Sequence, residues 1–418
     1  MTQQVLLDDG LVRTDGPNGL VVLSEQLAGV RSVALGIYVR TASAHETPAR
    51  MGISHCLEHM VFKGTARYSA KELALALESR GGSLDAFTGR DQTSYQAHIL
   101  DEDLPLAADV LTELVHRPLL RADDLALERN VILEEIAGME DTPDDLVFEL
   151  HSETLWGAHP YGYSILGTHD TVTAIDARAL AELHQRSYRR GSMVIAAAGN
   201  VDHEALCAEL EARGWFAAEA PGEPAPTVAP AAAVRGAERR EVNDTNQVHL
   251  VFGTDAFAST DPRRYALSIL VNTLGGGMSS RLFQRVREEL GLCYAVYAYK
   301  QLMQAAGQVG IYVATGPETA DAAADAIRAE CTLLAREGLT ADELVAGRRQ
   351  LKGQLMLALE GTGARMSRLA STALTGEPYR RLDDVLARID AVSSDDVAAL
   401  AAEFFDPVRF STVRLGPA

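Results

Sequence analysis

The sequence predicts an α+β protein with two homologous domains, each a mainly antiparallel sheet covered by helices, joined by a Pro/Ala-rich linker. The first observation is a stretch of four prolines among alanines, residues 219–234, which divides the 418-residue chain almost in half. This composition, without apolar periodicity, is typical of a semi-rigid linker. The predicted division is a domain at 1–218, a linker at 219–236 and a second domain at 237–418.

The second observation is a repeated order of elements, because each half places a strand, a helix, a strand, a helix and a long helix in succession. In the first half these elements are expected at 33–39, 49–62, 94–100, 104–115 and from 122; in the second half they are expected at 248–252, 261–274, 307–314, 319–336 and from 341. Such a repeat predicts a duplicated α+β domain. The alternative is fortuitous similarity between Ala/Leu-rich helices.

Composition excludes several classes of protein. Hydrophobic residues make up 47% and charged residues 23% of the chain, which are ordinary values for a globular protein. The 38 basic and 58 acidic side chains give a net charge of −20, so no nucleic-acid partner is expected. No apolar run approaches the roughly 18 residues of a membrane span, and residues 1–12 show no secretory signal pattern. The four cysteines form no CxxC pair, which favours a reducing, cytoplasmic location.

The motif with the clearest chemistry is His55-Cys-Leu-Glu58-His59. On an α-helix these three polar side chains share one side, within an arc of roughly 100°. Two imidazoles one turn apart can bind a single Zn²⁺, and the carboxylate beside them can take a proton from water. The alternative is a pair of ordinary histidines without a metal. Cys56 points away from this side and is interpreted as a buried thiol.

This motif resembles the inverted His-x-x-Glu-His signature of the inverzincins, the pitrilysin and mitochondrial processing peptidase family of metallopeptidases. The resemblance extends over most of the chain, in the same order. It includes 52–65 around the histidines, 81–89, 128–136, 159–168, 274–283 and 287–294. Membership implies the two-domain fold above and a peptidase activity.

The resemblance implies that Glu135, on a later helix, is the third zinc ligand. Adjacent Glu134 competes for this assignment, but one residue turns a helical side chain by about 100°, so only one of the two can face the metal. Glu128 corresponds to a supporting carboxylate behind the ligands. A site of His55, His59 and Glu135 with an open fourth position is the coordination of a catalytic zinc.

The implied reaction is peptide hydrolysis by one Zn²⁺ per chain, with Glu58 as the general base. Manganese or cobalt is an alternative, because the same ligands bind several divalent ions. By resemblance, Arg287 and Tyr294 of the second domain hold substrate carbonyls and stabilise the tetrahedral intermediate. The glycines at 275–277 have two interpretations, a helix-ending loop or a flexible segment near the substrate entrance.

The second half carries no zinc motif. Aligned by the repeat, Ile269, Asn272 and Thr273 stand where His55, Glu58 and His59 stand, and Gln354 stands roughly where Glu135 does. The first domain would therefore carry the metal chemistry, and the second would hold substrate.

The expected substrates are extended peptides. Asp85, Ala86, Phe87 and Thr88 lie in a segment resembling the family's edge strand, which receives a peptide by β-augmentation. Asp85 stands in place of the usual asparagine, and Gly89 in place of the usual serine. These departures could favour basic peptides; the alternative is an ordinary edge strand blunted by a charge.

Family members cleave inside a chamber of four such domains, so the resemblance implies a homodimer, with a heterodimer with a related chain as the alternative. The competing function is a non-catalytic or partner-dependent subunit of a processing-peptidase-like assembly.

Overall fold

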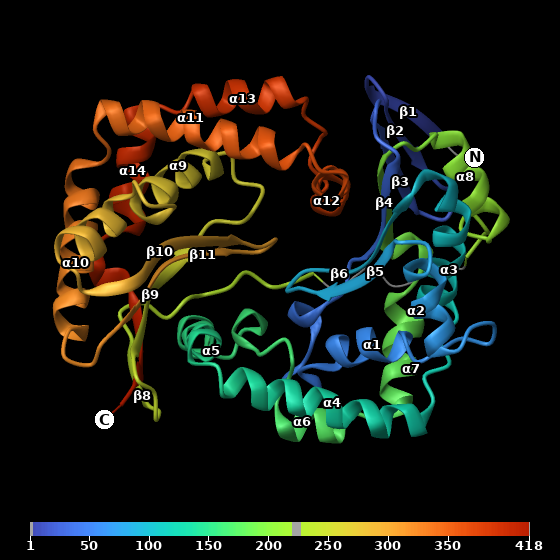
Figure 1. Cartoon of the computed structure of the whole chain (residues 1–418), viewed down its shortest axis with the longest axis horizontal. Helices are drawn as coiled ribbons and strands as arrows, with labels where there is room; N and C mark the ends of the chain where they lie inside the picture. The colour runs from blue at the N-terminus through green and yellow to red at the C-terminus, as the bar shows by residue number, and fades with distance from the viewer. Residues whose placement is uncertain (1–2, 220–226, 418) are drawn as a thin grey trace. The chain divides into compact units, whose positions relative to one another are not determined.

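The computed structural model describes residues 3–219 and 227–417, so part of the predicted linker, 220–226, lies outside the described residues. The chain forms two compact units, and each unit is built from three separate segments (Figure 1). Unit 1 consists of Met1–Ile136, Ser164–Thr227 and Leu357–Tyr379, and unit 2 of Ala137–Tyr163, Val228–Met356 and Arg380–Ala418.

These units differ from the predicted ranges 1–218 and 237–418 in two segments. Helix α5 (Pro143–Trp156) lies in the N-terminal half of the sequence but packs on strands β9 and β12 of unit 2. Helix α12 (Thr362–Thr375) lies in the C-terminal half but packs on strands β3, β4 and β7 of unit 1. Each sheet therefore has a helix from the other half of the chain on one face.

Unit 1 contains a seven-stranded sheet in the order β1-β2-β3-β7-β4-β6-β5. All neighbouring strands are antiparallel except the parallel pair β3 and β7. Strand β5 is at one edge. The strands are β1 (Gln3–Asp8), β2 (Leu11–Asp15), β3 (Val21–Gln26), β4 (Ser32–Val39), β5 (Ser83–Thr88), β6 (Thr93–Leu100) and β7 (Met193–Gly199).

The main core of unit 1 lies between one face of this sheet and a layer of helices that includes α1, α3 and α7. Alternate strand residues explain the two-sided burial: Val33, Leu35 and Ile37 face this layer, whereas Ala34 and Tyr38 face α12. The helices are α1 (Ile53–Val61), α2 (Ala70–Glu78), α3 (Leu104–His116), α4 (Ala122–Glu140, which continues into unit 2), α6 (His169–Ala174), α7 (Ala177–Ser187) and α8 (His203–Ala212), with short turns η1 (Ser43–His45), η2 (Pro48–Arg50), η3 (Asp101–Asp103) and η5 (Arg190–Ser192).

Unit 2 contains a five-stranded sheet in the order β10-β11-β9-β12-β8, in which only β12 and β8 are parallel. The strands are β8 (Glu238–Val242), β9 (Val248–Ala256), β10 (Cys293–Leu302), β11 (Gly307–Thr315) and β12 (Ser411–Gly416). The remaining helices are α9 (Arg264–Gly275), α10 (Ala320–Glu337), α11 (Ala341–Ala358), α13 (Leu382–Asp390) and α14 (Ser394–Phe404), with short turns η4 (Pro160–Gly162), η6 (Phe283–Glu289) and η7 (Pro407–Arg409).

The two sheets share one topology, which confirms the predicted α+β class with two homologous, mainly antiparallel domains. The order β3-β7-β4-β6-β5 in unit 1 corresponds to β8-β12-β9-β11-β10 in unit 2, and the single parallel pair occupies the same place in both. Strands β1 and β2 are the addition that distinguishes the first sheet.

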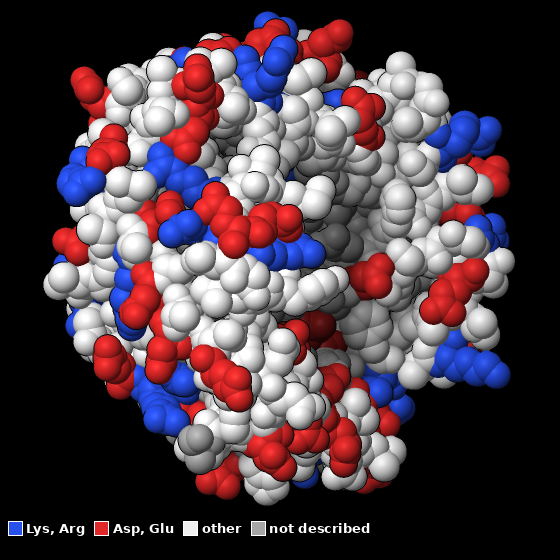
Figure 2. All heavy atoms as spheres, turned by 60° about the vertical axis from the view of Figure 1, so that its left-hand side comes forward, with Lys and Arg blue, Asp and Glu red and all other residues white. Residues whose placement is uncertain are grey.

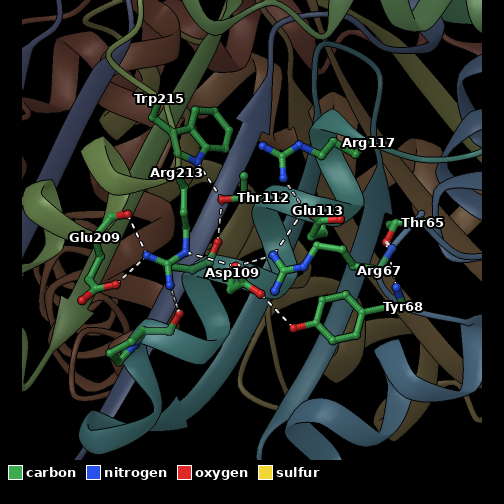
Figure 3. A network of polar contacts seen from close by, with 12 residues as sticks. Thr65, Arg67, Tyr68, Asp109, Thr112, Glu113, Arg117, Glu209, Arg213 and Trp215 are labelled. Atoms are coloured by element: carbon green, nitrogen blue, oxygen red, sulfur yellow. Dashed lines mark hydrogen bonds and ion pairs between the residues drawn. The ribbon is translucent and has the colours of Figure 1, made fainter.

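A polar network fixes helix α3 to the segment that follows α1 (Figure 3). The Asp109 carboxylate accepts hydrogen bonds from the Tyr68 hydroxyl at 2.8 Å and from the Arg67 guanidinium at 3.0 Å. The buried Glu113 carboxylate pairs with Arg67 and with Arg117. Because buried carboxylates are stable only when paired, this network holds residues 65–68 against α3.

Charged side chains of both signs are interspersed on the face of the molecule that Figure 2 shows. Within residues 3–219 and 227–417, no helix combines the length and the apolar composition that crossing a membrane would require.

Candidate metal centre

Helix α1 presents its polar side chains on the side opposite its core contacts. Ile53, Leu57 and Met60 are buried in the main core of unit 1. The side chains of His55 and His59 are 12% and 17% exposed and lie at the helix surface. Cys56 is buried, in agreement with the predicted buried thiol, and burial raises the pKa of this thiol to about 12.

The structure brings His55, His59 and Glu135 together in unit 1. Nε2 of His55 lies 3.2 Å from Nε2 of His59, and Oε2 of Glu135 lies 3.7 Å and 3.6 Å from these two nitrogens. Ligands of a tetrahedral zinc, at bonds of about 2.0–2.1 Å, stand about 3.3 Å apart. The three atoms therefore have the spacing of three corners of a metal tetrahedron.

Two further observations show that the donor set fits a metal. Oε2 of Glu135 is buried and has no hydrogen-bond partner among the described residues, although such atoms are normally satisfied. Burial, together with the nearby His59, lowers the pKa of His55 to about 4, so this imidazole is neutral and able to donate a lone pair at pH 7. His55, His59 and Glu135 also form the one metal-compatible group of three found within residues 3–219 and 227–417.

An ion pair between Glu128 and Lys63 lies next to His59, on the side away from Nε2. Nδ1 of His59 lies 2.9 Å from Oε1 of Glu128, a residue on α4 whose side chain is 7% exposed. The Lys63 ammonium pairs with the other oxygen of Glu128. A carboxylate at Nδ1 fixes the tautomer in which Nε2 carries a lone pair. No pattern in the sequence assigns a role to Lys63. Its role as the charge partner of Glu128 is seen only in the folded structure, where its ammonium group lies beside that carboxylate.

Helix α4 supplies both glutamates of the site. Glu128 and Glu135 are separated by two helical turns and share a side, whereas Glu134 is exposed to solvent. The rotation of α4 therefore places the carboxylate of Glu135, and not that of Glu134, beside the two histidines. The Arg129 guanidinium donates to the carbonyl oxygens of Val172 and Ile175 at 3.3 Å and 2.7 Å, which anchors α4 at the end of α6.

Glu58 lies beside the ligands, and its carboxylate accepts a hydrogen bond from the Thr88 hydroxyl. Burial raises the pKa of Glu58, and the bond from Thr88 opposes this shift. Thr88 ends the edge strand β5. On this strand Leu84 and Ala86 pack against the core, whereas Asp85 and Phe87 are exposed.

One functional residue that sequence analysis missed is Glu46. Its buried carboxylate accepts hydrogen bonds from the backbone N–H groups of Gly52 and Ser54, each at 2.8 Å. These are amides of the first turn of α1, which a helix cannot satisfy itself. Glu46 thereby fixes the start of the histidine helix. It lies nine residues before His55 with no recognisable spacing, so no sequence signal identifies it.

Arg287 and Tyr294 lie together in unit 2. The Arg287 guanidinium stacks over the rings of Phe283 and Tyr294, 4.5 Å and 5.0 Å from their centroids, and Tyr294 is 79% exposed. Arg287 is on η6, a π-helical turn, an irregularity that is frequent at functional sites. The nearby glycines end helix α9 at Gly275, as the helix-ending interpretation requires.

The positions in unit 2 that correspond to His55, Glu58, His59 and Glu135 are filled by an apolar, an amide, a hydroxyl and an amide side chain, respectively. Ile269 is completely buried on α9, and Asn272 donates its side-chain amide to Oε1 of Gln354 at 2.8 Å. A Cβ at Gly347 of α11 would lie 2.8 Å from Ile269, so only glycine allows this approach. In unit 2, helices α9 and α11 are therefore in direct contact at the place where α1 and α4 of unit 1 carry the histidines and the glutamate.

The chain matches two family models that describe the two halves. Residues 21–169 match the model described as insulinase, peptidase family M16, and residues 174–351 match that of the peptidase M16 inactive domain. An uncharacterized zinc protease of Streptomyces coelicolor is 40% identical over 94% of this chain and 86% of its own length. One of Bacillus subtilis is 38% identical over 93% of this chain and 94% of its own length. The chain therefore belongs to peptidase family M16, in agreement with the resemblance to the pitrilysin family.

Solved structures share the fold. A protease from Helicobacter pylori superposes with a TM-score of 0.91 at 20% identity, covering 100% of this chain and 99% of that one. The peptidase M16 inactive domain from Pseudomonas fluorescens gives a TM-score of 0.89 at 22% identity, covering 98% of each chain.

Proposed function

We propose that this protein is a zinc-dependent endopeptidase that hydrolyses extended peptides or unfolded segments. The observation that carries the proposal is the convergence of Nε2 of His55, Nε2 of His59 and Oε2 of Glu135 to within 3.7 Å of one another, with Glu58 on the same helix face. Relatives at 38–40% identity are named zinc proteases, which supports zinc as the metal.

His55, His59 and Glu135 would hold one Zn²⁺ per chain. When bound, zinc lowers the pKa of a water molecule and polarises a peptide carbonyl. Glu58 would act as the general base, accepting a proton from the attacking water and passing it to the leaving amine. Glu128 holds His59 in the tautomer that leaves Nε2 available, and Lys63 compensates the charge of Glu128.

Substrate would bind as an added strand on the outer edge of β5, at Asp85, Ala86, Phe87 and Thr88. The place of β5 at the end of the sheet supports this assignment. Exposed Asp85 would favour a basic side chain in the peptide. Arg287 and Tyr294 would hold substrate carbonyls, and the stacking of the half-buried Arg287 guanidinium on the exposed ring of Tyr294 is compatible with that role.

We further infer a homodimeric chamber in a reducing, cytoplasmic compartment, with a related chain as the alternative partner. The free state of all four cysteines fits such a compartment. Light scattering of the purified chain measures the assembly directly: a mass of two chains supports the homodimer, and a mass of one chain supports the need for another partner.

The test of the proposed function compares the wild type with Glu58→Gln and with Glu134→Gln, an exposed neighbour of Glu135. We expect Glu58→Gln to keep one zinc per chain but to lose cleavage of a diverse peptide library by about 10²-fold or more, because the proton acceptor is gone. Glu134→Gln should keep both properties. Zinc content is measured by elemental mass spectrometry and cleavage by mass spectrometry of the peptides.

Chelation should abolish cleavage, and added zinc should restore it. Zinc binding without cleavage of any peptide by the wild type would favour the competing function, a non-catalytic subunit. Full activity of Glu58→Gln would contradict the role given to Glu58.

A further inference from the structure

The edge strand β5 and the proposed general base are joined by a direct contact. Thr88 is the last residue of β5, and its hydroxyl donates to Oε2 of Glu58 on α1. The Thr88 hydroxyl group is buried, whereas Asp85 and Phe87 of the same strand point to solvent. One residue of the proposed peptide-binding strand thus turns inward and holds the side chain that would activate water.

The backbone around Thr88 is held firmly on the side of α1. The turn after β5 is closed by the Gly89 N–H, which donates to the Gln92 carbonyl at 2.9 Å. The Ser43 hydroxyl donates to the Gly89 carbonyl at 3.0 Å. Three residues after Ser43, Glu46 accepts from the amides of the first turn of α1. The segment 43–46 therefore anchors both the end of β5 and the start of the helix that carries Glu58.

A glutamate side chain has three rotatable torsions, so a carboxylate at a helix surface samples several positions unless a neighbour restrains it. The hydrogen bond from Thr88 restrains the Glu58 carboxylate, and the anchored turn restrains Thr88. The restraint is thus built from two rigid elements, as a catalytic group requires.

We propose that Thr88 is a positioning residue, whose hydroxyl holds the Glu58 carboxylate in the orientation needed for proton transfer. This inference rests on the proposed function and gives Thr88 a role beyond backbone contact with a peptide. Since β5 would carry the substrate strand on its outer edge, the same strand aligns the peptide and the base.

The decisive variants are Thr88→Val, which keeps the shape but removes the hydroxyl, and Thr88→Ser, which keeps the hydroxyl. Thr93→Val is the matched control. Thr93 is the cross-strand partner of Thr88 on β6, and its buried hydroxyl donates to the Thr41 carbonyl at 3.1 Å instead of to Glu58.

We expect Thr88→Val to lower kcat at least about tenfold, a part of the 10²–10⁴-fold that a general base contributes, with KM changed less than about threefold and zinc content unchanged. Thr88→Ser should recover most of the lost kcat. Thr93→Val should lower the melting temperature and leave kcat and KM near the wild-type values. Wild-type kcat in Thr88→Val, or an equal loss in Thr93→Val, would overturn the proposal.

A second readout is independent of activity. Crystal structures of the metal-free wild type, Thr88→Val and Thr88→Ser report the position of the Glu58 carboxylate. We expect it to leave its wild-type position in Thr88→Val alone, and an unmoved carboxylate would overturn the proposal. If the wild type cleaves no peptide, the proposed function fails, whereas the crystal structures still decide whether Thr88 positions Glu58.

Discussion

At the scale of single residues, the buried carboxyl of Glu46 links the stability of the fold to pH. Burial raises the pKa of Glu46 from 4.5 to about 7, against the hydrogen bonds from Ser54 and Gly52 and the nearby charge of Arg90. The folded chain therefore holds this proton more tightly than the unfolded chain does. As a result, the contribution of Glu46 to the free energy of unfolding falls as pH rises from about 4.5 to about 7.

We expect Glu46→Gln to remove this dependence. As pH rises from 5 to 8, the wild type should lose about 3 kcal/mol of its free energy of unfolding relative to the variant, which is the order of magnitude of such a pKa change. Urea unfolding of the metal-free proteins measures it, with Glu134→Gln as the exposed control. Parallel pH curves for wild type and Glu46→Gln would contradict the prediction.

At the scale of elements, the start of α1 depends on one glycine. Gly52 has a φ of +85° and stands directly before the helix. A Cβ at this position would lie 2.5 Å from the Leu166 carbonyl oxygen and 2.7 Å from Cα of Gly167. Any other residue would therefore displace either the 166–167 segment or the first turn of the histidine helix.

The variant Gly52→Ala should accordingly lose more stability than Gly214→Ala, whose φ is +82° but whose Cβ would meet nothing within 4 Å. The backbone conformation alone costs Ala about 1–2 kcal/mol, which both variants share. Thermal unfolding compares the two, and zinc titration should show weaker binding only in Gly52→Ala. Equal effects of the two substitutions would show that the close approach to 166–167 is unimportant.

The sequence could predict the histidine helix well, because the spacing of His55 and His59 and the apolar pattern around them depend only on helix geometry. The predicted strands and the duplication follow from local periodicity in the same way. Glu46, Lys63 and the contact of Thr88 with Glu58 could not be predicted, because they join segments whose separation in the sequence carries no pattern.

At the scale of the whole molecule, the sequence could also not predict that α5 packs in unit 2 and α12 in unit 1. We call this placement of each helix on the sheet of the other half of the chain the exchange of α5 and α12. An amphipathic helix shows that it will cover a sheet but does not show which sheet. Met366 and Leu369 of α12 are buried against Tyr38 and other residues of unit 1. Burial of each such side chain stabilises the fold by about 1.5–3 kcal/mol.

If the chain is cut at a protease site engineered into the 219–236 segment, the two fragments should therefore stay associated. The N-terminal fragment carries α5, which packs in unit 2, and the C-terminal fragment carries α12, which packs in unit 1. Gel filtration of the cut protein should show the elution volume of the uncut protein, and the fragments should separate only in denaturant. Two separate peaks in native buffer would contradict the exchange.

The position of α12 in the sequence also affects how unit 1 folds while the chain is being synthesised on the ribosome. The N-terminal sheet has all its strands once Gly199, the last residue of β7, is made, but the helix that covers its second face ends only at Thr375. At ordinary translation speeds this delay is on the order of ten seconds. During that interval the nascent chain presents a row of apolar strand residues, Ala34, Tyr38, Val194 and Ala196 among them, to the surrounding solvent and to chaperones.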